Sequence, residues 1–165
     1  LESEEDELDP FTGDTMPFEI VLDSGAADHV ADPEDAPGQT IVPSAGSKRG
    51  AGFLAADGER IANQGQMELN LLKEGGRFNS TFQACKVNRP LWSVSKICRS
   101  GYEVLFTADG AQVRAKGTDK PICSFEQKNG LYVFEFALKR PQFPATATGA
   151  QASNAQPAVF ARQGR

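Results

Sequence analysis

The sequence predicts a single domain built mostly of β-strands. Several short segments alternate hydrophobic and polar residues, turn dipeptides such as Asp57-Gly58 separate them, and only one segment has the pattern of a helix. A chain of 165 residues suits one domain with flexible ends. We therefore expect a mostly β fold with one short helix.

The two ends of the chain differ in composition from the middle. Residues 1–15 contain seven acids and no base, whereas residues 139–165 contain four bases and no acid and are rich in Ala, Thr, Gln, Pro and Gly. Such segments bury too little apolar surface to fold. We predict an acidic disordered head over 1–15, a folded domain over 16–138 and a flexible basic tail over 139–165. Because the chain opens on Leu1, we interpret it as a piece of a longer protein.

The first predicted strand, MPFEIVL (16–22), has apolar residues on both faces, which favours a central position in a sheet. It stops at Asp23. Residues 31–48 contain three prolines and two glycines and are expected to form a loop, with one short strand at 39–42.

A hairpin is predicted next, with a tight two-residue turn at Asp57-Gly58, where both residues would need a positive φ. Its flanks, FLAA (53–56) and RIAN (60–63), are small and only partly apolar. We therefore expect this hairpin to project from the body of the domain.

The remaining elements follow in order. A helix is predicted over 94–99, capped by Ser93, ended by Gly101 and burying the face of Val94, Ile97 and Cys98. Strands are predicted around it, over the ranges 66–72, 78–87, 102–107, 111–116 and 130–138.

Composition argues against several classes of function. Residues 1–15 contribute −7 and residues 139–165 contribute +4 to the net charge of −5, which leaves −2 for the middle. The middle is therefore nearly neutral and does not resemble a nucleic-acid-binding surface. The three cysteines are isolated, and with a single histidine they cannot make a zinc site, so we expect no metal and no cofactor. They fit buried, reduced thiols in an intracellular, cytoplasmic protein. No apolar run is long enough to span a membrane.

Three segments, in this order, carry a resemblance to a known family: VLDSGAADHV, AADGERIANQGQ, and RPLWSVSKICRSGYEVLFTADGAQV followed by GLYVFEF. Together they resemble the retropepsin-like aspartic protease region of copia-type retrotransposon polyproteins over about residues 18–136. The resemblance implies a closed β-barrel in which the second segment is a flap hairpin over the substrate.

The resemblance also implies a mechanism in which Asp23, Ser24 and Gly25 form the catalytic turn. A pepsin-like site needs two carboxylates that share one proton around a water. No second Asp-[Ser/Thr]-Gly occurs in residues 31–138, so an active enzyme must be a two-fold homodimer with one aspartate from each chain. We expect a mildly acidic optimum.

The implied substrate is a polypeptide, bound extended between the turn and the flap. Ala26 would lie near the peptide, and the flap residues Ala56, Asp57 and Gly58 would cover it. Trp92 and Val94 are candidates for substrate pockets, although a place in the core suits both better.

Two interpretations of this domain remain open. The first is an active homodimeric endopeptidase that processes a retrotransposon polyprotein, which the intact Asp23-Ser24-Gly25 favours. The second is a catalytically silent peptide-binding or scaffold domain, which Trp92 favours because the family has an aliphatic residue there. A serine triad of Ser24, His29 and Asp28 is disfavoured because no nucleophile elbow is present. We expect His29 to make a structural hydrogen bond instead.

Overall fold

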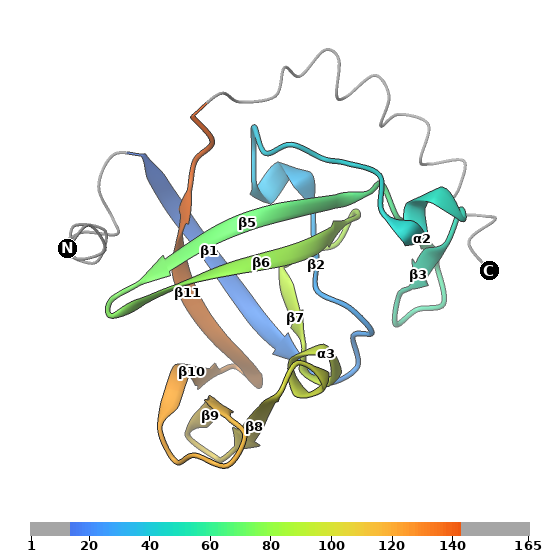
Figure 1. Ribbon diagram of the computed structural model, residues 1–165. Coiled ribbons are helices and arrows are strands. Elements are labelled where there is room, and N and C mark those ends of the chain that lie inside the picture. The colour runs from blue at the N-terminus through green and yellow to red at the C-terminus, as the bar shows by residue number, and fades with distance from the viewer. Residues whose placement is uncertain (1–13, 143–165) are drawn as a thin grey trace.

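A computed structural model describes residues 14–142, and over that range the chain is mostly β, as predicted. The predictions for residues 1–13 and 143–165 lie outside the described residues. Figure 1 shows a large sheet with a small hairpin beside it. The strands of the large sheet are β1 (Thr15–Asp23), β2 (Val30–Ala31), β5 (Gln66–Lys73), β6 (Gly76–Ala84), β7 (Leu91–Ser93), β8 (Tyr102–Phe106), β9 (Gly110–Ala115), β10 (Pro121–Lys128) and β11 (Leu131–Lys139).

Strand β1 is central in this sheet, as its two apolar faces predict. It pairs antiparallel with β11 from Thr15↔Lys139 onward, and its last three residues pair in parallel with β7, ending at Asp23↔Ser93. Phe18 and Ile20 are buried. Strand β11 pairs with β1 as far as Val21, and β7 alone pairs with its last residue, Asp23.

The predicted closed barrel is wrong. The strands form one nine-stranded sheet in the order β1-β7-β2-β6-β5-β11-β10-β9-β8, with an additional β1–β11 pairing that folds the sheet back on itself. Strands β10, β9 and β8 continue past β11 as an arm that ends at β8. This arm contains β10, which sequence analysis missed although Cys123 and Phe125 alternate as buried residues in it.

The core is largely aromatic and aliphatic. Phe82, Phe136, Leu69 and Leu71 are completely buried. Trp92 is buried among aromatic rings and donates a hydrogen bond from Nε1 to Ser80 Oγ (3.1 Å). The core assignment for Trp92 is therefore confirmed, and its indole N–H has the partner that a buried tryptophan requires.

The predicted helix is present as α3 (Val94–Arg99), with Ser93 as its N-cap accepting from Lys96 N. Ile97 is buried, but Cys98 is exposed, so the predicted apolar face is narrower than expected. The predicted strand at 39–42 is reduced to one bridge, Val42↔Gln66.

Two further short helices were not predicted, α2 (Ala45–Lys48) and the 3-10 helix η1 (Pro33–Asp35). Ser44 and Ser47 cap α2 reciprocally, and Asp32 caps η1. Both caps lie in a segment rich in proline and glycine, and that composition predicts a loop rather than helical turns.

The predicted projecting hairpin is a separate two-stranded sheet, β3 (Gly52–Leu54) and β4 (Arg60–Ala62). Its turn differs from the prediction. Gly58 has φ +89°, but among the described residues Asn129 is the single non-glycine with a positive φ, so Asp57 does not adopt one. Gly58 N donates to Ala55 O, and Ala55 N donates to Glu59 O, which makes a three-residue loop closed by Gly58.

Candidate active site

The Asp23 turn, residues 23–26, begins where β1 ends. Gly25 N donates to Asp23 Oδ1 at 2.7 Å, which fixes the carboxylate over the turn. A Cβ on Gly25 would stand 3.3 Å from that oxygen, a tight contact, so glycine suits the position. Asp23 is half-buried, whereas Ser24 and Gly25 are exposed. The predicted residues therefore present one carboxylate on a small, accessible turn.

Ser93 holds the Asp23 turn from the neighbouring strand. Its Oγ donates to Ala26 O at 2.7 Å and also accepts from Lys96 N, so one hydroxyl serves both the turn and the N-cap of α3. The Ser93 side chain is fully buried. The first turn of α3 and the Asp23 turn are thus tied together through one residue.

His29 makes the structural hydrogen bond that the sequence led us to expect. Its Nδ1 accepts from Ser93 N at 2.9 Å, which requires an unprotonated Nδ1. The side chain is buried against Phe82 and Trp92. Burial, followed by the positive charge of Lys96, lowers the pKa of His29 to about 4 despite the opposing effect of Asp28. A neutral His29 is therefore part of the folded site.

Asp28 and Lys96 form an ion pair next to the turn. Lys96 Nζ lies 2.6 Å from Asp28 Oδ1, and both side chains are about one-third exposed. The same Oδ1 accepts from His29 N at 2.7 Å. This pair connects the segment after the Asp23 turn to the first helical turn of α3.

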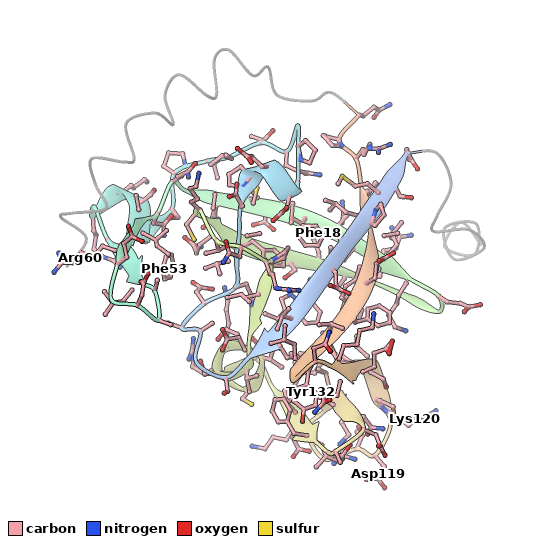
Figure 2. The ribbon with its side chains drawn as sticks, turned by 180° about the vertical axis from the view of Figure 1, so that it is seen from behind. Phe18, Phe53, Arg60, Asp119, Lys120 and Tyr132 are labelled. Carbon is pink, nitrogen blue, oxygen red and sulfur yellow. The ribbon has the colours of Figure 1, made fainter. Side chains whose placement is uncertain are left out.

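An open cleft of about 1670 Å³ joins the Asp23 turn to the β3–β4 hairpin. Six of the seven residues predicted for the site line this cleft, namely Asp23, Ser24, Gly25, Ala26, Ala56 and Asp57. Gly58 does not line it. Segments about 30 residues apart in the sequence therefore face one space, as the flap prediction requires. Figure 2 shows Phe53 and Arg60 on the hairpin and Tyr132 on the body, and all three line the cleft.

Sequence analysis missed one wall of this cleft. Phe106, Leu131 and Tyr132 line it from β8 and β11. The rings of Phe106 and Tyr132 meet edge to face with centroids 4.9 Å apart, and Tyr132 Oη donates to Thr107 O. No local motif marks these residues, because the long-range β1–β11 pairing brings Leu131 and Tyr132 toward the end of β1, and Phe106 packs on Tyr132 from another strand.

The two buried cysteines, Cys85 and Cys123, are poorly suited to act as nucleophiles, and Cys98, expected to be buried, is exposed and does not line the cleft. Cys85 lines the cleft, yet burial raises its pKa to about 12, and burial likewise raises the pKa of Cys123 to about 12. Such thiols stay protonated near neutral pH. Within residues 14–142, no three acidic, histidine or cysteine side chains gather closely enough to hold a metal ion. None of the helices in this range is long and apolar enough to cross a membrane.

Comparison with known proteins adds no family: no family model, curated protein or solved structure matches the chain.

Proposed function

We propose that this chain is an aspartic endopeptidase that acts as a homodimer, with Asp23 of each copy sharing one catalytic water. The observation that carries the proposal is the single cleft lined by the Asp23 turn and by the β3–β4 hairpin. A carboxylate at the end of a buried strand, facing a hairpin that can close over an extended peptide, suits peptide hydrolysis. The implied substrate is a polypeptide, and a retrotransposon polyprotein fits the resemblance of the sequence.

In this proposal the two aspartates share one proton, because two carboxylates about 3 Å apart do not both ionise easily. One aspartate takes a proton from the water as it attacks the scissile carbonyl, and the other donates a proton to the carbonyl oxygen. Ser24 holds the two turns together across the axis, and Gly25 permits their close approach. The reaction uses no cofactor.

The β3–β4 hairpin acts as the flap. In the described part of the chain it pairs with no strand of the large sheet, and Leu54 near its end is 60% exposed. An apolar, exposed hairpin end can cover a bound peptide and exclude water from the reaction. Ala56, Asp57 and Gly58 form its loop.

The test is cleavage of a peptide library between pH 4 and 7 at high protein concentration, with Asp23→Asn as the variant. Asparagine retains an oxygen that can accept from Gly25 N, so the turn is expected to keep its shape. Asp109→Asn is the control, because Asp109 is an exposed turn residue outside the cleft.

We expect cleavage by the parent and by the control, and none by Asp23→Asn. Equal cleavage by all three would reject the aspartic mechanism. Cleavage by none would favour the silent peptide-binding domain.

A further inference from the structure

The position of the β3–β4 hairpin depends on its root, residues 46–51 and 63–65, where its two legs join the body. Among residues 14–142, neither β3 nor β4 pairs with a strand of the large sheet. The first leg follows α2, and Ala51 N donates to Gly46 O (2.9 Å) where the helix ends. The second leg leaves β4 at Asn63. Figure 1 shows α2 and β3 together at one side of the sheet.

The Asn63 side chain contacts both legs and the large sheet. It is 4% exposed; its Oδ1 accepts from Gly65 N at 2.9 Å, and its Nδ2 donates to Gln83 Oε1 at 2.9 Å. A Cβ on Gly46 would stand 2.9 Å from that Nδ2, so α2 lies directly against the same amide. One buried side chain therefore joins the second leg to α2 and to β6.

The Asn63–Gln83 hydrogen bond is shielded from water, because Gln83 is only 7% exposed. Breaking a buried hydrogen bond leaves a donor or an acceptor without water, which costs more than the bond itself contributes. Backbone bonds flank the pair: Gln64 N donates to Ala84 O at 2.7 Å, and Ala84 N donates to Gly65 O at 2.8 Å. They hold the second leg, and the Asn63 side chain adds the contact with α2.

Gln83 also connects the root to the Asp23 turn. Its backbone N donates to His29 O at 2.8 Å. His29 Nδ1 accepts from Ser93 N, and Ser93 Oγ donates to Ala26 O in the turn. Gln83, His29 and Ser93 are all buried. The hairpin root and the Asp23 turn are therefore held by the same short series of buried residues.

We propose that Asn63 and Gln83 are positioning residues, which hold the β3–β4 hairpin at the height over the Asp23 turn at which it binds an extended peptide. This inference deepens the proposed function and rests on it for the role of the hairpin. Neither side chain lines the cleft, whereas Ala62 and Gln64 do, so the pair acts through the hairpin. A loosened hairpin must be ordered when the peptide binds, which weakens the binding of substrate and transition state alike.

Two root variants remove the same hydrogen bond from opposite sides. Gln83→Met keeps the length of the side chain and removes the acceptor, and Asn63→Ser keeps an oxygen for Gly65 N and removes the donor. Ser80→Ala is the matched control. Ser80 is also buried on β6, and its loss removes one buried hydrogen bond, from Trp92 Nε1, away from the hairpin. Circular dichroism checks that each is folded, and either folded root variant suffices.

Hydrogen–deuterium exchange of the whole chain, read by mass spectrometry, follows the hairpin without any substrate. We expect residues 51–66 to exchange at least ten-fold faster in both root variants and at the parent's rate in Ser80→Ala. The double root variant should exchange no faster than the faster single variant, because both changes remove one bond. Parent-like exchange in a folded root variant, or equal acceleration by the control, would overturn the inference.

Steady-state cleavage by the same samples distinguishes positioning from a merely structural role. We expect the root variants to raise KM at least five-fold with kcat little changed, and the control to leave KM unchanged. Partial unfolding would instead lower kcat at an unchanged KM, and that result would also overturn the inference. Faster exchange in the root variants of a chain that never cleaves would keep the anchor and reject the protease. Parent-like exchange with parent-like cleavage would reject the anchor and keep the protease.

Discussion

At the scale of single residues, the pKa of His29 makes the stability of the site depend on pH. His29 is 9% exposed, and its pKa falls from 6.5 to about 4 in the folded chain. The unfolded chain therefore binds the proton first as the pH drops. The contribution of a neutral His29 to the free energy of unfolding is complete above pH 6.5 and is lost as the pH falls toward 4. The shift corresponds to about 3 kcal/mol of unfolding free energy.

We predict that His29→Asn abolishes this part of the pH dependence. The asparagine Oδ1 can accept from Ser93 N in place of Nδ1, and it does not titrate. Urea unfolding at pH 7 and at pH 4 should give a parent-minus-variant difference that shrinks by about 3 kcal/mol at the lower pH. An unchanged difference would mean that the pKa of His29 is the same in the folded and the unfolded chain, and would contradict a buried, neutral His29.

The Asp28–Lys96 pair positions the segment after the Asp23 turn. We predict that Lys96→Met destabilises the chain by about 1 kcal/mol, since the pair is short and partly shielded from water. Because α3 and the turn then lose a connection, the kcat for peptide cleavage should fall more than KM changes.

Glu19→Gln is the control for this prediction. Glu19 approaches Arg89 and Lys128 at 3.9 and 4.0 Å with well-exposed side chains, so its loss should change unfolding free energy by only a few tenths of a kcal/mol. A Lys96→Met variant that matches Glu19→Gln in stability and in kcat would contradict the positioning role.

At the scale of elements, two glycines test whether the β3–β4 hairpin acts on the substrate. Gly58 in the hairpin and Gly75 in the β5–β6 turn both have a positive φ, +89° and +82°, with open space around them. Alanine at either position should cost about 1 kcal/mol of local strain. We predict that Gly58→Ala lowers kcat/KM several-fold and that Gly75→Ala leaves it unchanged. Equal effects on steady-state cleavage would argue against a flap.

The elements that were predicted correctly are those with strong local signals. Ser93 and Gly101 bracket α3, and the dense apolar run before Asp23 makes β1 central. The errors come from local signals that other interactions override. Asp57-Gly58 suggested a two-residue turn, yet the turn with two positive φ values is Asn129-Gly130, at 53° and 83°. The loop at Asp57 has one more residue, so Gly58 alone needs the positive φ.

At the scale of the whole molecule, the sequence predicted the near side of the candidate site but not its far wall. Asp23 to Ala26 and the β3–β4 loop are local motifs, so spacing along the chain was enough to choose them. Tyr132 reaches the cleft through the β1–β11 pairing, which joins segments more than 100 residues apart, and Phe106 of β8 packs against its ring. The aromatic wall therefore depends on topology, and strand alternation alone does not determine topology.

The central claim is that each of two copies supplies one Asp23, and a mixing experiment tests it most directly. The parent and Asp23→Asn are combined in equal amounts, allowed to exchange subunits, and assayed for peptide cleavage against the parent alone at the same total concentration. Random pairing leaves about one quarter of the dimers with two aspartates, so the account predicts about one quarter of the parent's activity. Activity of about one half would mean that each chain works alone, and would contradict a site built from two copies.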